Sequence, residues 1–275
     1  MKYQLNNLSV KTTNHFKVNN FEINLQLPMI KTLNEYEIKN QQNILIETKI
    51  KEKNFKTKIG LEFPKYLDIN ITIPKNTIIK EPIILRHSFE KKETLPCQIN
   101  ILCKESSSAK LIIEYQSKDS TEHWNYVKES LKAEKNSEAS ISYWNNLNSN
   151  SMNMIAWEGS LEENATITHN VIDNGGKTRI YNAYIEAKEY NSKNIFHMIY
   201  IGTDNNKIDI NYDFKNIGKK SVNKLVVEGS LSDNAEKIFR GTIDFKKGSR
   251  NSIGEENENC VLLSDECRSR SLPML

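Results

Sequence analysis

Alternation of apolar and polar residues is the feature that most constrains this chain. From Leu67 to Ile73, four apolar side chains occupy one parity and three polar side chains occupy the other. Successive side chains of a strand point to opposite faces of a sheet, so this segment is predicted to be a half-buried strand. The same alternation recurs over 99–103, 111–115, 183–187 and 208–214. Short strands therefore dominate the predicted structure.

Internal similarity favours a solenoid over the other all-β folds that short strands and frequent turns permit. Glu158-Gly159-Ser160-Leu161 recurs seventy residues later as Glu228-Gly229-Ser230-Leu231, and Glu129-Ser130-Leu131 is a weaker copy. Chance recurrence of a common turn sequence is the alternative. Because stacked coils repeat one strand-and-turn unit, we predict an all-β fold, a right-handed parallel β-helix (β-solenoid) of about ten irregular coils with little helix.

Two segments are less regular than the rest. The first 25 residues fit either a short helix or an edge strand. In 126–135, Val127 and Leu131 have helical spacing, but Trp124 and Tyr126 alternate as in a strand, so we predict a strand here. We expect an amino-terminal segment over residues 1–60, with edge strands or a short helix, and a β-helix core domain over 61–275.

Composition argues against several classes of function. Charged residues make up 27% of the chain, the net charge is +3, and Lys and Arg are scattered, so no nucleic-acid partner is expected. The amino terminus has no apolar signal-peptide region, and no apolar run is long enough to span a membrane, so we expect a cytoplasmic protein. Four cysteines, none in a Cys-x-x-Cys pair, are too few for a disulfide scaffold and argue against a structural zinc site.

The carboxyl-terminal quarter contains an ordered set of short motifs. Val227-Glu228-Gly229-Ser230-Leu231 precedes Phe239-Arg240-Gly241-Thr242-Ile243, and Cys260-Val261-Leu262-Leu263 precedes Ser271-Leu272-Pro273. A β-coil, a Phe-x-Gly-x-Ile strand, a Leu-Leu strand and then a proline, in this order, resemble the SufB/SufD family of iron-sulfur cluster assembly scaffolds. The resemblance extends more faintly upstream to about Leu67.

The resemblance implies a fold and a role. The family folds as a right-handed parallel β-helix with helical ends and dimerises through it, so a homodimer or a related scaffold subunit is expected. Its members bind an ABC-type ATPase and help to build a transient iron-sulfur cluster for apoprotein acceptors, while the scaffold itself is not an enzyme. The chain stops at Leu275, where family members continue, which implies a truncated form of the compact, single-scaffold type.

The resemblance also implies two ligand positions. In SufB-type members one ligand cysteine precedes the final proline, and an ungapped alignment on Cys267 and Pro273 puts Glu258 at that position. Cys260 lies two residues further on and would share the same face of a strand. Glu258 and Cys260 are therefore the candidate metal and iron-sulfur ligands, with a carboxylate where the family has a thiolate. The alternative for Cys260 is a small core residue.

Other candidates have simpler interpretations. Cys97 and Cys103 are six residues apart, on one face of a strand, and are interpreted as packing residues. Cys267 is interpreted as part of a solvated turn, although nearby Arg268 would favour its thiolate. His169 and His197, 28 residues apart, would stack if a coil had that length. Two rival functions remain: a carbohydrate-binding or carbohydrate-processing β-solenoid, and a purely structural solenoid.

Overall fold

The protein is built from strands. The computed structural model describes residues 2–4, 22–24, 36–52, 55–56, 62–63 and 65–274, and within these ranges it contains no helix. The helical ends that the family resemblance implies are thus not present in the described ranges. None of the described residues forms a helix long and apolar enough to cross a membrane.

In the part of the chain that the structure describes, six strands precede the solenoid: β1 (Lys2–Gln4), β2 (Glu22–Asn24), β3 (Glu37–Lys39), β4 (Leu45–Lys51), β5 (Phe55–Lys56) and β6 (Glu62–Phe63). The strands β1 and β2 are antiparallel, so an extended pair is present where the sequence allowed a helix or a strand. The strands β3 and β4 pair antiparallel with the first solenoid strands, β8 and β7. The division of the chain at residue 60 stays a prediction.

Fifteen strands of seven to ten residues follow, and they form the solenoid. The first eight are β7 (Tyr66–Ile73), β8 (Ile83–Phe89), β9 (Thr94–Cys103), β10 (Ser108–Ser117), β11 (Trp124–Ala133), β12 (Glu138–Asn146), β13 (Met152–Leu161) and β14 (Thr166–Asp173). The others are β15 (Thr178–Ala187), β16 (Lys193–Gly202), β17 (Lys207–Asn216), β18 (Val222–Leu231), β19 (Glu236–Phe245), β20 (Ile253–Leu262) and β21 (Arg268–Met274). The strand predicted over 126–135 is confirmed over 126–133, within β11, whereas residues 134–135 belong to the turn that follows.

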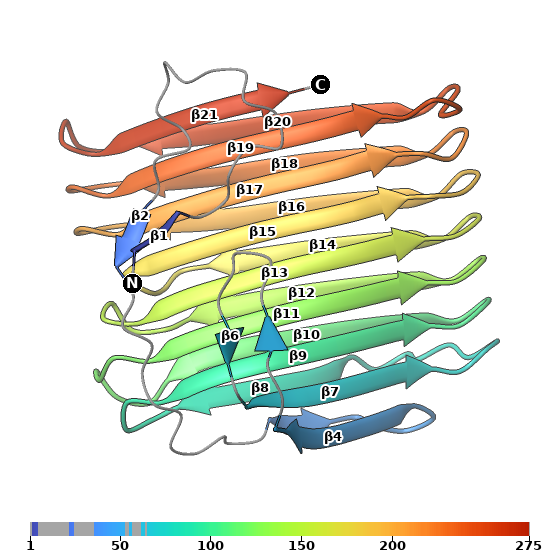
Figure 1. Cartoon of the computed structure of the whole chain (residues 1–275), viewed down its shortest axis with the longest axis horizontal. Helices are drawn as coiled ribbons and strands as arrows, with labels where there is room; N and C mark the ends of the chain where they lie inside the picture. Colours follow the sequence, from blue (N-terminus) through green and yellow to red (C-terminus); the bar gives the residue numbers. More distant parts are fainter. Residues whose placement is uncertain are drawn as a thin grey trace.

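The solenoid strands alternate between two stacked parallel sheets (Figure 1). The even-numbered solenoid strands β8 to β20, together with β3, form an eight-stranded sheet, and the odd-numbered solenoid strands β7 to β21, together with β4, form a nine-stranded sheet. One strand from each sheet makes a coil, so seven complete coils run from β7 with β8 to β19 with β20. The expected count of about ten was wrong because each coil is longer than that count allows: register partners in neighbouring coils lie 26 to 32 residues apart.

Each coil is held mainly by the coils directly above and below it. Strand β11, for example, pairs in parallel with β9 on one side and with β13 on the other. Successive coils differ slightly in length: Asn125 donates to Asn153, 28 residues away, whereas Asn194 donates to Asn223, 29 residues away. The repeated Glu-Gly-Ser-Leu lies at the end of β13 in one sheet and at the end of β18 in the other. The repeat in the sequence is therefore a half-coil, a strand and the turn that follows it.

The core fills the space between the two sheets. Inward positions alternate with outward ones along each strand, as in β16, where every second residue from Asn194 to Gly202 is buried. Aromatic rings stack through the middle coils: the ring of Trp157 lies 5.7 Å from that of Tyr181 and 5.3 Å from that of Phe196. Apolar side chains of several coils therefore share one continuous core.

A row of asparagines marks the turns that lead from the nine-stranded to the eight-stranded sheet. Asn136, Asn164 and Asn191 have positive φ angles of 58°, 56° and 54°. Asparagine tolerates this left-handed conformation better than most residues. The Asn164 side chain donates to Asn136 Oδ1 at 3.1 Å, and that of Asn191 donates to Asn164 Oδ1 at 2.9 Å. The turns therefore stack in register as the strands do.

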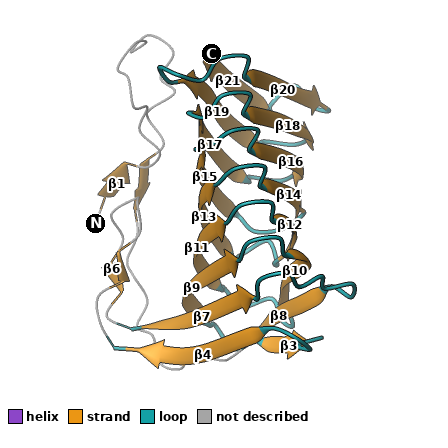
Figure 2. Cartoon of the chain, turned by 90° about the vertical axis from the view of Figure 1, so that its right-hand side faces the viewer, coloured by secondary structure: helices purple, strands orange, loops and turns teal. Residues whose placement is uncertain are grey.

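The outer faces of the two sheets differ, and Figure 2 shows both sheets from the side. On the nine-stranded sheet, Tyr126 points outward yet is only 1% exposed, and the Phe63 ring of β6 lies 4.7 Å from its ring. On the eight-stranded sheet, Trp144, Ile172 and Ile199 are neighbours in register and are 49%, 52% and 53% exposed. The amino-terminal strand β6 thus covers part of one face, and a row of apolar side chains stays exposed on the other.

Candidate functional site

The inward face of β20 breaks the apolar pattern of the core. Its inward positions include Glu256, Glu258 and Cys260, all partly buried. In the strand beneath, β18, their register partners are apolar residues or glycine: Leu225, Val227 and Gly229. We call the group formed by Glu256, Glu258, Cys260 and the Ser271 of β21 the mouth. The mouth lies at the end of the solenoid, where no described strand pairs with the outer edge of β20 or β21.

The structure places both predicted ligands in this group. Glu258 and Cys260 face the interior from the same strand, two residues apart, as the alternation predicted. Within the described ranges, no three His, Cys, Asp or Glu side chains are close enough together to hold a metal ion. The assignment of Glu258 and Cys260 as ligands therefore stays a prediction.

A buried lysine holds Glu258. Lys237 extends inward from β19, and its side chain is 0% exposed while that of Glu258 is 15% exposed. The ammonium group donates to Glu258 Oε1 and, at 3.1 Å, to Ser271 Oγ. The Ser271 hydroxyl in turn donates to Glu258 Oε2 at 2.8 Å. Glu258 is thus bonded at both oxygens, and the ion pair offsets the cost of burying the lysine charge.

Glu256 has no such support. Both of its carboxylate oxygens are buried without a hydrogen-bond partner. Gly241 makes room for the carboxyl group, since a Cβ atom on Gly241 would lie 2.2 Å from Glu256 Oε1. Burial, and to a smaller extent the charge of Glu258, raise the pKa of Glu256 to about 7. Near neutral pH this side chain is therefore poised between its acid and its carboxylate.

Cys260 lies beside a buried tyrosine. Tyr200 of β16 is in register with Gly229 of β18, which is in register with Cys260. The Tyr200 ring lies across Gly229, because a Cβ atom there would approach it to 2.4 Å. Its hydroxyl faces the Cys260 thiol without closing a hydrogen bond of good geometry. Burial and the neighbouring Cys260 raise the pKa of Tyr200 well above its usual range. The missing side chain at Gly229 thus lets the Tyr200 hydroxyl reach the Cys260 sulfur from two coils below.

The other three cysteines are packed in the protein. Cys97 and Cys103 share the inward face of β9, as predicted, and both are 0% exposed. Burial raises the pKa of the Cys103 thiol to about 12. The interpretation of Cys267 as a solvated residue was wrong: it is 6% exposed, and its thiol donates to the Ser264 carbonyl at 3.0 Å. Cys260 is the one cysteine that is partly exposed.

A second inward carboxylate lies in the middle of the solenoid. Glu129 is fully buried; it accepts a short hydrogen bond from the Tyr143 hydroxyl, and its Oε1 lies 3.0 Å from His169 Nε2. His197 does not stack on His169 as the spacing suggested, since β14 and β16 are offset by 27 residues and His169 faces Phe196. His197 is exposed instead. The Glu129 group is enclosed by the core on all sides, so we interpret it as structural.

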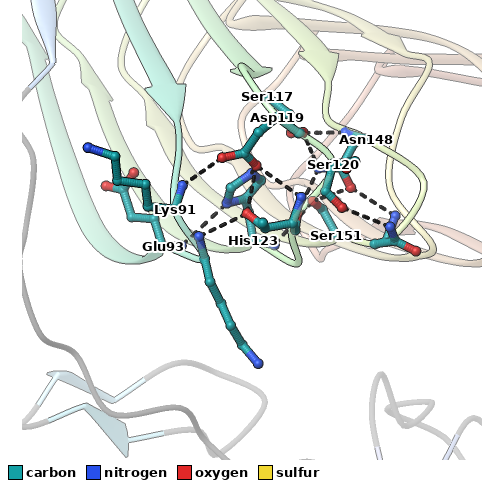
Figure 3. A network of polar contacts seen from close by, with 11 residues as sticks. Lys91, Glu93, Ser117, Asp119, Ser120, His123, Asn148 and Ser151 are labelled. Atoms are coloured by element: carbon teal, nitrogen blue, oxygen red, sulfur yellow. Dashed lines mark hydrogen bonds and ion pairs between the residues drawn. The ribbon is translucent and has the colours of Figure 1, made fainter.

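A polar network also has a structural role at the turns that lead from the eight-stranded to the nine-stranded sheet (Figure 3). The Asp119 carboxylate accepts from the Lys91 backbone N–H at 2.7 Å and from the Thr121 N–H at 2.9 Å, and it lies 3.0 Å from His123 Nε2. The Thr121 hydroxyl, which donates to Asp119 Oδ1 at 2.6 Å, lowers the pKa of Asp119 most, and the two backbone N–H groups lower it further. Burial lowers the pKa of His123, whose Nδ1 accepts from the Glu93 N–H at 3.3 Å. The network ties turns of successive coils together.

A shallow groove of about 520 Å³ lies on the outer face of the nine-stranded sheet. Asn70, Asn100 and Ser130 are among its lining residues. The amides bond to one another, since Asn100 Nδ2 donates to Asn70 Oδ1 at 2.9 Å and Asn100 Oδ1 accepts from Gln98 Nε2 at 2.8 Å. Their donors and acceptors are thus already used, and the groove is a weaker candidate than the mouth.

Sequence reasoning missed Ser271 and Tyr200, and it also missed two charged members of the site region, Glu256 and Lys237. Both have a detectable signal, since each shares the parity of inward neighbours: Glu256 with Glu258 and Cys260, and Lys237 with Phe239. Charged residues in strands are usually assigned to the solvent-exposed face, and under that assumption the shared parity is overlooked.

Comparison with known proteins gives the family. No curated protein matched the chain. The family model described as "SUF system FeS cluster assembly, SufBD core domain" matches residues 87–275, which include every solenoid strand from β9 to β21 and the whole mouth. The chain therefore belongs to the SufBD core domain family of the SUF system for iron-sulfur cluster assembly.

Proposed function

We propose that this protein is a scaffold subunit of an ATP-dependent iron-sulfur cluster assembly complex, with Glu258 and Cys260 as transient ligands. Family membership supports a role in cluster assembly. The observation that carries the site is the change of the inward residues of β20 from apolar to acidic and thiol groups. Burying such groups in a core costs free energy, so their presence there favours a functional role.

The chemistry of the mouth suits a cargo that must leave again. Thiolates are the usual ligands of iron-sulfur clusters, and carboxylates bind iron as hard ligands. One thiol and two carboxyl groups form a weaker set than four cysteines. A cluster held this way would depend on further ligands from a partner subunit or from the acceptor, which favours transfer.

The edges of β20 and β21 support a dimer, either a homodimer or a pair with a related scaffold subunit. Unpaired strand edges readily add strands from another chain. Apolar side chains are exposed where β20 ends, with Val261, Leu262 and Leu263 being 57%, 52% and 65% exposed. A dimer joined here would bring two mouths together. Light scattering after size-exclusion chromatography should give twice the chain mass, and a monomer at high micromolar concentration would contradict the dimer.

The remaining partners follow from the same proposal. ATP hydrolysis belongs to an ABC-type ATPase subunit, the cluster passes to apoprotein acceptors, and the scaffold itself is not an enzyme. We place the complex in the cytoplasm, because all four cysteines are free, as is typical of proteins in a reducing compartment.

Anaerobic reconstitution tests the proposal. The full-length protein is mixed with its candidate ABC ATPase, ferrous iron and sulfide, and the visible spectrum and bound iron are recorded. We expect a cluster chromophore that Cys260→Ala or Glu258→Ala abolishes and that Glu255→Ala, an outward substitution on the same strand, leaves intact. If the wild-type complex gives no chromophore, the scaffold proposal fails. If the ATPase does not bind either, a structural solenoid becomes the better interpretation.

A further inference from the structure

Lys237 is out of place in the core. Its register partner in β17 is Ile208, which is 0% exposed, and the next inward residue of β19 is Phe239, also 0% exposed. Burying an ammonium group in such surroundings is unfavourable unless a carboxylate compensates it. Glu258 provides that compensation, so the position of Lys237 depends on the same carboxylate that is proposed as an iron ligand.

The ammonium group of Lys237 occupies the position in the mouth that a bound metal cation would take. It bonds to Glu258 and to Ser271, two oxygen donors of the kind that divalent metal ions prefer. Other polar groups near Glu258 and Cys260 have no hydrogen-bond partner. Both Glu256 oxygens lack a partner, and the Tyr200 hydroxyl, on a residue that is 0% exposed, points at Cys260 without a good hydrogen bond. The mouth therefore has more acceptors than its own cation satisfies.

We propose that Lys237 is a built-in competitor of the metal cargo: a divalent cation binds Glu258 only by displacing the Lys237 ammonium group. This inference rests on the proposed function, because it assumes that Glu258 is a ligand. Because the ammonium group must be displaced, the cation binds more weakly than it would to an open carboxylate. When the cation leaves, Lys237 pairs with Glu258 again. Lys237 is thus a positioning residue that sets how tightly the site holds its cargo.

The charge balance favours an anionic co-ligand. With both carboxylates ionised, Glu256 and Glu258 carry two negative charges and Lys237 carries one positive charge. A bound divalent cation would leave the mouth one unit positive, since the displaced ammonium group stays tethered nearby. A thiolate at Cys260 or a sulfide ion would neutralise that excess, whereas without Lys237 the carboxylates alone would balance the metal.

Cation titration tests the inference. Tag-free full-length protein is titrated with Co²⁺, which stands in for Fe²⁺ and reports its ligands by absorption, under reducing conditions without sulfide. Lys237→Met keeps the length of the side chain but removes the charge, and it should bind Co²⁺ at least about tenfold more tightly than wild type. Lys237→Arg should stay as weak as wild type. Lys224→Met is the matched control, since Lys224 pairs at 2.8 Å with the outward Glu255 of the same strand.

A second measurement uses the wild-type chain, so it does not depend on how the variants fold. The reactivity of the Lys237 amine towards an acylating reagent is measured by peptide mass spectrometry, with and without Co²⁺. Displacement should expose the amine and raise its labelling several-fold, while Lys224 labelling stays constant. Unchanged labelling at saturating Co²⁺, equal affinity of wild type and Lys237→Met, or no Co²⁺ binding by either protein would each overturn the inference.

These outcomes are separate from those of the proposed function. The scaffold proposal fails when wild-type protein with its ATPase forms no cluster. The Lys237 inference fails when removing its charge leaves cation affinity unchanged, even if a cluster forms.

Discussion

Glu129 and Glu256 are both inward-facing glutamates of this solenoid, and their surroundings are opposite. Glu129 lies in the middle coils with Tyr143 and His169 at its oxygens and no exposed surface. Glu256 lies at the end of the solenoid, against Gly241, with no partner at either oxygen. The same residue type in the same orientation is therefore a closed structural element in one coil and an available acid in another. The difference comes from the neighbouring coils, which enclose Glu129 on both sides.

Removing Glu129 should have the largest effect on stability. Glu129→Ala leaves a cavity and strands the Tyr143 hydroxyl and His169 Nε2 in the core, so the free energy of unfolding should fall by about 3–4 kcal/mol. Urea unfolding followed by circular dichroism measures the loss. Glu129→Gln, which keeps the shape and one acceptor, should cost clearly less. A loss below about 1 kcal/mol for Glu129→Ala would show that the closed carboxylate does not support the core.

Gly229→Ala should come next, because it fills the space that the Tyr200 ring occupies. The new Cβ would lie 2.4 Å from the ring, so the ring must move away from Cys260. Overpacking of this kind costs about 2–3 kcal/mol. Gly159→Ala is the matched control in the middle coils, since its Cβ would meet Ile185 only at 3.3 Å and should cost less than about 1 kcal/mol. Thermal unfolding of the two variants compares them, and equal melting temperatures would contradict the tight approach at Gly229.

Glu256 should make stability depend on pH, in the direction opposite to most carboxylates. Its pKa rises from 4.5 to about 7 on folding, so the folded state binds the extra proton between these values. Stability is then highest below the unfolded pKa and falls as the pH rises towards 7, by about 1–2 kcal/mol after allowance for solvent screening. Glu256→Gln should flatten this part of the profile. Unfolding midpoints between pH 4.5 and 7.5 measure it, and parallel profiles for the two proteins would exclude a raised pKa.

The smallest effect is expected for Glu255→Gln. Glu255 immediately precedes Glu256 in β20, points outward, and is 58% exposed in its pair with Lys224. Exposed ion pairs contribute little, so stability should change by no more than about 0.5 kcal/mol, as urea unfolding would show. A larger loss of stability would mean that charged side chains contribute on both faces of β20. The contrast between the inward Glu256 and the outward Glu255 would then not hold.

Much of this fold could be predicted from the sequence because strand alternation is local. The segment from Leu67 to Ile73 and the pairs Cys97–Cys103 and Glu258–Cys260 lie on the faces that period two assigned to them. The coil count and the stacking of His169 on His197 were wrong, because both depend on the length of the turns. One residue fewer between β14 and β16 moves His197 to the other face.

Only the site residues that lie on one strand were predicted. Glu258 and Cys260 share β20, but Lys237 comes from β19, the other strand of the same coil, and Tyr200 comes from β16, two coils beneath. Their approach depends on register between coils and on the absence of a side chain at Gly229. Neither follows from the alternation of a single strand.

The stacking of each coil only on its neighbours has a consequence for how the molecule comes apart. Hydrogen bonds between coils run along the solenoid, so the strands at its end can unzip while the middle coils stay intact. Amide protons of β20 and β21 should then exchange with solvent well before those of β13 or β15. The mouth is thus built on the part of the solenoid that frays first, and any partner that clamps this end would stabilise the site by preventing the fraying.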